Sequence, residues 1–248
     1  MANSARQLAE VITMPARTVG GQASGVASAT AETVRAWTAN EVDDWGRDNA
    51  FVNRMWSLSR LRWSTSVGGG EHLPKRAGAL IVINARRFAL APVLASLAIG
   101  AEVDRPVRFV GRPDIAPIGP MMQRLGALLP LEAEVEGALR AGGLVVLGAE
   151  HLATNQRSGL IDHRLVGAAV AAKVRVVPAA AVSVPTRRNA RVEIGPPVRL
   201  RHRRRGPLEE LETADLLQSR IDAMLDELGG TLTGTPLDWL PTGGIGGL

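Results

Sequence analysis

The chain has 248 residues, of which 46% are hydrophobic and 21% charged, so it can bury a core of globular proportions. It contains no cysteine, which excludes disulfides, a thiolate nucleophile and a zinc site built on cysteine ligands. Its formal net charge is +5, and nearly all of its positively charged residues are arginine. This charge favours an anionic partner, such as a phosphate or an acidic lipid headgroup. The four histidines are scattered, and we expect neither a metal nor a cofactor.

The N-terminal part differs in composition from the rest. Residues 1–30 are rich in alanine, serine, glycine and threonine, which predicts a flexible arm, and two helices are expected over 31–46 and 49–62. The glycines at 68–70 are interpreted as a linker. We therefore predict an N-terminal arm with helices at 1–66, an α/β domain at 67–230 and a glycine-rich tail at 231–248. Because the N-terminus lacks a secretion signal, we expect a cytoplasmic protein.

The middle of the chain alternates between short β-rich runs and helical stretches. The expected strands lie at 79–83, 107–110, 144–147, 174–182 and 191–194. The expected helices lie at 90–100, 118–125, 132–141, 162–172 and 208–228. This alternation predicts an α/β fold with a mostly parallel central sheet and helices on both faces.

The helix expected at 49–62 is amphipathic. Its apolar stripe consists of Phe51, Val52, Met55, Trp56 and Ser59, with arginines close by. The stripe has two interpretations, since such a helix either lies in a membrane interface or packs on the core of its own domain. The sequence contains no apolar run of about 18 residues, so we do not expect a helix that spans a membrane. Together with the basic surface, the first interpretation predicts a protein peripheral on the inner face of an anionic membrane.

Polar residues follow two of the expected central strands. Asn84, Arg86 and Arg87 follow the run at 79–83, and Glu150 and His151 follow the run at 144–149. The carboxyl ends of parallel strands meet at one edge of a sheet, where such folds bind ligands. We therefore predict a substrate-binding site made of these five residues, in which the two arginines clamp an anion.

The order of blocks over about residues 50–200 resembles the glycerolipid, lysophosphatidate-type acyltransferase family. The blocks that carry the resemblance are Glu71-His72-Leu73-Pro74 with a strand and Asn84, Pro117-Ile118-Gly119-Pro120 with Leu125-Gly126, Val145–Glu150, and Val176-Val177-Pro178-Ala179. The resemblance implies an acyltransferase-like fold and a lipid or another acylated or anionic ligand.

The residues that the resemblance implies for catalysis are missing. The family's His-x-x-x-x-Asp dyad falls at Ala85 and Leu90, neither of which can take up a proton. Its phosphate-gripping arginine falls at Leu131, and of its third block only Glu150 remains, followed by His151. We therefore interpret the chain as a degenerate member with no catalytic residues, which binds a lipid, acylated or anionic ligand.

Two alternatives stay open. One is an active acyl-CoA-dependent lysophospholipid acyltransferase in which His72 or His151 replaces the lost base. The other is a nucleic-acid binder that uses the run Arg201-His202-Arg203-Arg204-Arg205, which is disfavoured because no aromatic residue interleaves the arginines. The alanine-rich, arginine-rich and lysine-poor composition resembles that of proteins from high-GC bacteria, so we expect a bacterial source.

Overall fold

A central sheet organises the computed structural model, which describes residues 42–86, 91–113, 115–151, 160–183, 189–199 and 206–229. These residues belong to one compact unit that begins at Glu41. Of the helix expected at 31–46, residues 31–41 lie outside the described residues, and residues 42–46 form a turn instead. The turn arises because the Asp43 carboxylate accepts hydrogen bonds from the backbone N–H groups of Trp45 and Arg47, both at 3.0 Å.

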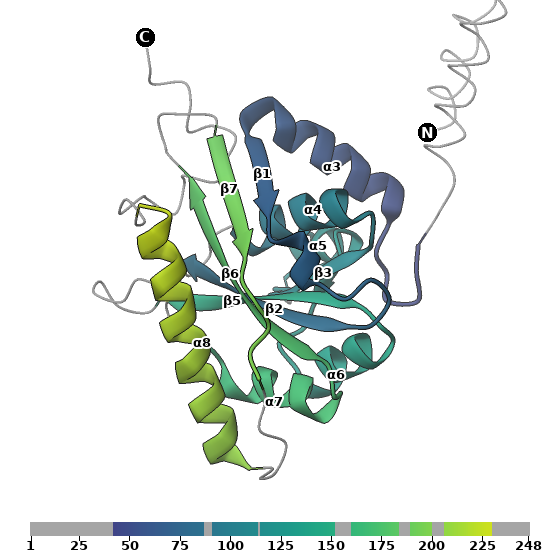
Figure 1. Cartoon of the computed structure of the whole chain (residues 1–248). Coiled ribbons are helices and arrows are strands. Elements are labelled where there is room, and N and C mark those ends of the chain that lie inside the picture. The colour runs from purple at the N-terminus through teal and green to yellow at the C-terminus, as the bar shows by residue number, and fades with distance from the viewer. Residues whose placement is uncertain are drawn as a thin grey trace, which may run out of the picture. The chain divides into compact units, whose positions relative to one another are not determined.

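Seven strands in the described part of the chain form one sheet in the order β1-β7-β6-β2-β5-β3-β4 (Figure 1). Their bounds are β1 Ser64–Gly68, β2 Ala79–Arg86, β3 Val107–Val110, β4 Ala127–Leu128, β5 Leu144–His151, β6 Arg175–Ser183 and β7 Asn189–Ile194. Only β6 and β7 pair antiparallel, and the other neighbours are parallel. The predicted mostly parallel sheet is confirmed.

Helices cover both faces of the sheet, as predicted. The described helices are α3 Asn49–Arg62, the short 3-10 helix η1 Gly70–His72, α4 Ala91–Val103, α5 Ile118–Arg124, α6 Glu132–Arg140, α7 His163–Ala171 and α8 Pro207–Glu227. The apolar residues of α3 and α4 pack on one face, and those of α6, α7 and α8 pack on the other. The arrangement in Figure 1 places α8 against β6, away from α3.

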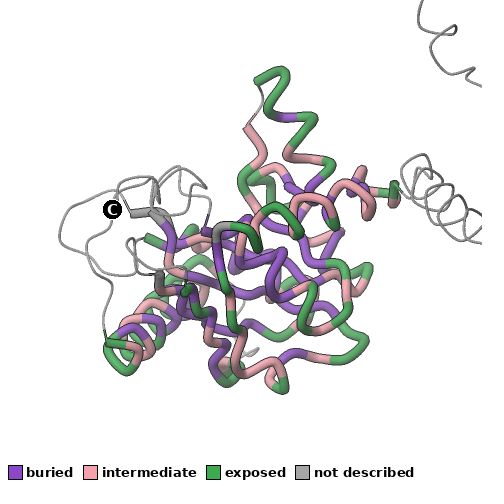
Figure 2. The backbone as a smooth tube through the Cα atoms, turned by 90° about the horizontal axis from the view of Figure 1, so that it is seen from above, coloured by how far each residue is buried: buried purple, intermediate pink, exposed green. Residues whose placement is uncertain are grey.

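The central strands are buried on both faces because their side chains alternate between two apolar layers. In β2, Ile81 and Ile83 face the layer that contains α4, whereas Leu80 and Val82 face the layer that contains α6, α7 and α8. All four of these side chains are fully buried. The buried interior surrounded by exposed helix faces is visible in Figure 2.

The N-terminus of α3 is anchored by one carboxylate. Asp48 caps the helix by accepting from the Phe51 backbone N–H at 2.9 Å, and it also pairs with Arg124 of α5 at 2.6 Å. Burial alone would raise the pKa of Asp48, but the hydrogen bonds from Arg124 and from the Phe51 amide hold it below its usual value. The anchor fixes α3 against α5.

Anchored in this way, α3 turns its predicted stripe toward the protein. Val52 is buried, and Phe51, Met55 and Trp56 are partly buried against the core. Of the two interpretations of the stripe, the structure supports packing on the domain's own core. Among the described residues, no helix is both long enough and apolar enough to cross a bilayer.

The carboxyl end of α4 is closed by two charged residues. Asp104 ends the helix in the left-handed region, with φ of 49°, a conformation that aspartate tolerates better than most residues. The guanidinium of Arg105 then donates to the carbonyl oxygens of Pro74, of Ala77 at 3.2 Å and of Gly142 at 2.9 Å. Arg105 therefore ties the approach to β2 and the turn before β5 to the end of α4.

Candidate functional site

The parallel pairing of β2 with β5 brings together four of the five predicted site residues. In register, Asn84 lies opposite Ala149, Ala85 opposite Glu150 and Arg86 opposite His151. The backbones of Asn84, Arg86, Glu150 and His151 therefore lie side by side at the carboxyl edge of the sheet. The fifth residue, Arg87, lies outside the described residues, as do Leu90 and the arginine run at 201–205.

Asn84 has a structural role that the sequence did not indicate. Its side-chain amide donates to the Ala181 carbonyl oxygen at 2.9 Å, and its carbonyl oxygen accepts from the Ala181 N–H at 2.7 Å. The backbone pairing between β2 and β6 extends only as far as Ile83 and Ala179. Asn84 thus extends the connection between the two strands after their ladder ends. A role for Asn84 in binding a ligand stays a prediction.

Position 85, where the resemblance expects a general base, is filled by a small buried side chain. Ala85 is only 6% exposed. A methyl group built on the neighbouring Gly148 would lie 2.9 Å from Ala85 Cβ and 2.9 Å from Pro92 Cγ, so glycine is required there for close packing. Alanine, glycine and the first turn of α4 therefore close this part of the edge, and no proton acceptor stands at position 85.

The two histidines considered as replacement bases lie in different places. His72 belongs to η1, where its Nδ1 lies 3.0 Å from the Ile194 carbonyl oxygen. Gly70, in the same short helix as His72, lies near Val103, the last residue of α4. Ala85 lies near Pro92, in the first turn of α4. A 13-residue helix is about 20 Å long, so His72 is far from position 85. His151, in contrast, is in register with Arg86.

Exposed apolar side chains surround this edge, a feature that the sequence reading missed. Ile115, Ile118 and Met121 follow β3, and Leu131 follows β4; each is 46% or more exposed. The end of α3 adds Leu58 and Leu61, which are 55% and 72% exposed. That end leads directly into β1, whose first residue pairs with the start of β7 beside the carboxyl end of β6. We call these six residues the apolar rim.

The described residues present no cluster of three or more histidine, aspartate or glutamate side chains that could hold a metal ion.

The fold is similar to that of an acyltransferase of known structure. Neither protein-family models nor the sequences of curated proteins match the chain. Among solved structures, it is similar to the 1-acyl-sn-glycerophosphate (LPA) acyltransferase PlsC from Thermotoga maritima, with a TM-score of 0.53 and 14% sequence identity. The similarity covers 84% of this chain and 90% of that chain. The predicted acyltransferase-like fold is therefore confirmed.

The Asn84 bridge makes a direct prediction about stability. Asn84→Ala removes two hydrogen bonds and leaves the buried N–H and carbonyl of Ala181 without these partners, which should destabilise the fold by about 2 kcal/mol. Urea unfolding followed by circular dichroism measures the change. Asn189→Ala, at an exposed position at the start of β7, is the matched control and should change stability by about 0.5 kcal/mol or less. Equal stability of the two variants would show that the bridge contributes nothing.

Proposed function

We propose that the chain binds an anionic lipid or acylated ligand at the carboxyl edge of β2 and β5 and does not transfer acyl groups. The observation that carries this proposal is Ala85, a buried methyl group at the position where the resemblance places the general base. Loss of a general base typically costs about 10²–10⁴-fold in rate. The fold shared with an acyltransferase supports a lipid ligand, and the missing base argues against turnover.

The anion is bound, in this proposal, by Arg86 and Arg87. Arg86 occupies the last position of β2, opposite His151 at the end of β5, and Arg87 is the next residue in the sequence. Arginine guanidinium groups match the geometry of phosphate and carboxylate oxygens and form charge-assisted hydrogen bonds with them. The segment that lacks the catalytic dyad carries two cations. Cations favour binding of a charged headgroup, but they do not take a proton from a hydroxyl group.

A second candidate function is acyl transfer from acyl-CoA to a lysophospholipid with a non-standard base. The observation in its favour is the strand register: His151 of β5 pairs with Arg86 of β2, the residue after Ala85. A histidine therefore lies on the strand next to position 85. An imidazole has the pKa range suited to general base catalysis. His72 is disfavoured for this role because it lies at the other end of α4.

The arginine clamp is tested by binding of lysophosphatidate to the Arg86→Ala/Arg87→Ala variant, measured by calorimetric titration. Each lost charge-assisted bond is worth about 1.5–3 kcal/mol, so affinity should fall on the order of 10²-fold or more. The matched control is Arg140→Ala/Arg220→Ala, which removes the same charge from exposed positions on α6 and α8. Unchanged affinity in the Arg86/Arg87 variant would remove these arginines from the site, and equal losses in both variants would indicate only a general charge effect.

The ligand would reach the edge from a membrane surface. The apolar rim gathers six large hydrophobic side chains around the carboxyl edge, and the chain carries a formal charge of +5. Apolar side chains that enter the interface and a positive charge that attracts acidic headgroups act together in peripheral binding. We therefore place the anionic membrane against the apolar rim, not against the buried stripe of α3.

Vesicle flotation tests this placement. The protein should float with vesicles that contain phosphatidylglycerol and bind at least several-fold less to vesicles of phosphatidylcholine alone. Leu58→Glu/Leu61→Glu should abolish most of the binding, since it puts two carboxylates on the rim. Leu208→Glu is the control, because that leucine is 77% exposed but lies at the start of α8, on the other face of the sheet. Full binding by the Leu58/Leu61 variant would contradict the placement.

A further inference from the structure

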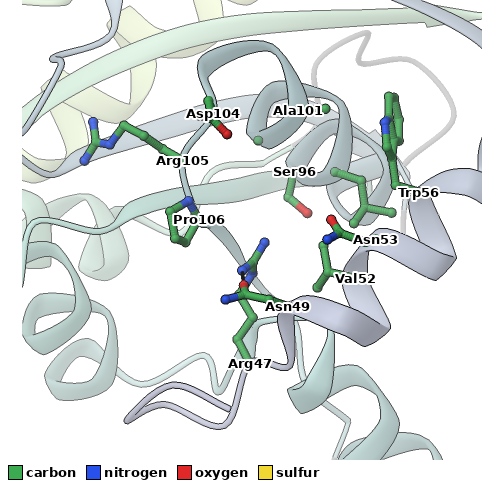
Figure 3. A pocket seen from close by; sticks show the side chains of 12 residues that line it. Arg47, Asn49, Val52, Asn53, Trp56, Ser96, Ala101, Asp104, Arg105 and Pro106 are labelled. Carbon is green, nitrogen blue, oxygen red and sulfur yellow. Dashed lines mark hydrogen bonds between the residues drawn. The ribbon is translucent and has the colours of Figure 1, made fainter. Parts of the chain in front are cut away.

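A cavity of about 350 Å³ lies between α3, α4 and the segment that leads into β3. It is separate from the carboxyl edge of the sheet, because its wall from α4 begins at Ser96 and continues through Ala101 to Pro106, toward the amino end of β3. Figure 3 shows the two helices on one side and residues 104–106 on the other. The proposed function does not use this cavity.

One buried cation points into the cavity. Arg47, just before α3, is only 7% exposed, and its guanidinium extends from the loop toward the middle of the cavity, with Ser96 and Asn53 across from it (Figure 3). Its Nη1 donates to the Asn49 side-chain oxygen, but its Nε is buried without a hydrogen-bond partner. Arg47 lines the cavity with a buried guanidinium, so the part of the guanidinium that faces the cavity can donate to an acceptor bound there.

The charges around Arg47 do not balance. Arg108 lies close to Arg47 and forms an ion pair with Asp43. The Asp43 carboxylate also accepts hydrogen bonds from two backbone N–H groups of the turn. The nearby pair formed by Asp48 and Arg124 is already neutral. Two buried arginines therefore share one aspartate, which leaves about one positive charge without compensation. Burial, and then repulsion from Arg108, lower the pKa of Arg47, although Asp43 partly opposes this.

The other walls of the cavity are partly apolar. Val52, Trp56 and Leu97 line it, and Asn53 and Ser96 add short polar groups. The Ser96 hydroxyl donates to the Val93 carbonyl at 2.7 Å, so toward the cavity it offers only acceptor capacity. Asp104, at the mouth, is exposed to solvent. A ligand with one negative charge at Arg47 and an apolar body along α3 and α4 fits this distribution.

We propose that this cavity is a second binding site, for a small carboxylic acid with a short apolar chain, whose carboxylate pairs with Arg47. A single carboxylate supplies the one negative charge that the arginines lack and can accept from the Arg47 guanidinium where it lines the cavity. The apolar chain lies against Val52, Trp56 and Leu97. The inference is independent of ligand binding at the carboxyl edge.

Calorimetric titration with octanoate tests the proposal, with 1-octanol and octyl phosphate as comparison probes. Octanoate should bind with at least ten-fold higher affinity than 1-octanol, because the alcohol lacks the charge. Octyl phosphate should bind more weakly than octanoate if the site matches a single charge. Absence of octanoate binding, or equal affinity for octanoate and 1-octanol, would overturn the proposal. Tighter binding of octyl phosphate than of octanoate would overturn the assignment to carboxylates.

Two variants connect the binding to the cavity. Asn53→Trp places a large ring at an exposed position of the lining and should weaken octanoate binding at least ten-fold, whereas Leu58→Trp, on the same helix but outside the lining, should not. Arg47→Met should weaken binding about ten- to a hundred-fold, and Arg47→Lys should restore part of it. If Arg47→Met does not fold, the comparison of Asn53→Trp with Leu58→Trp decides. Equal octanoate affinity in those two variants would contradict a site in this cavity.

Asn53→Trp also separates this proposal from the proposed function. The variant should bind lysophosphatidate as tightly as the unmodified chain, because the carboxyl edge lies at the opposite end of α4. A parallel loss of lysophosphatidate binding would show that the two ligands share one site and would overturn the assignment of a second one.

Discussion

The parallel pairing of β2 with β5 on one side and β6 on the other is the constraint on which the rest of the structure depends. Both neighbours begin in register at Ala79, so all three strands run buried through the middle of the sheet. The pairing with β5 continues to Arg86, whereas the pairing with β6 stops at Ile83. Asn84 bridges the gap to β6 that opens there, and the longer ladder with β5 holds the edge residues of β2 and β5 side by side.

The same edge is where the chain differs from what the acyltransferase resemblance implies. The fold is similar to that of an acyltransferase, yet position 85 carries a methyl group packed beside Gly148 and Pro92. Packing of this kind stabilises the edge without leaving a group that takes up a proton. At this edge Arg86 ends β2 opposite His151, which ends β5, and the apolar rim lies around them. We propose that this edge binds a ligand and does not transfer acyl groups.

The sequence predicted most of the architecture because the signals for it are local. Short windows of sequence show the runs of aliphatic residues in β2, β5 and β6. They also show the helical spacing of apolar residues in α6, α7 and α8. β1 was missed because Ser64–Gly68 contains only one large apolar residue, and it becomes a strand by pairing with β7, more than a hundred residues later. The helix predicted at 42–46 is a turn in the structure, because the Asp43 carboxylate accepts hydrogen bonds from two backbone N–H groups of the segment. Such hydrogen bonds leave no periodic pattern of apolar residues in the sequence.

The site was less predictable than the fold. The adjacency of Asn84, Arg86, Glu150 and His151 could be predicted, because residues at the carboxyl ends of neighbouring parallel strands lie side by side. The bridge from Asn84 to Ala181 depends on where the β2–β6 ladder ends, and the unpaired Nε of Arg47 depends on the packing of α3 against α4. Both are properties of tertiary structure. A buried arginine and an exposed one look the same in a sequence.

The central proposal is that the chain combines an acyltransferase-like fold with the absence of acyl transfer. The most direct measurement incubates the purified protein with acyl-CoA and lysophosphatidate and follows the formation of phosphatidate, with the Thermotoga maritima enzyme assayed alongside. The account predicts product no higher than in buffer alone. Robust turnover would contradict it. Turnover lost on His151→Ala would assign the reaction to the second candidate function, and turnover that survives His72→Ala/His151→Ala would mean that the account of the edge itself is wrong.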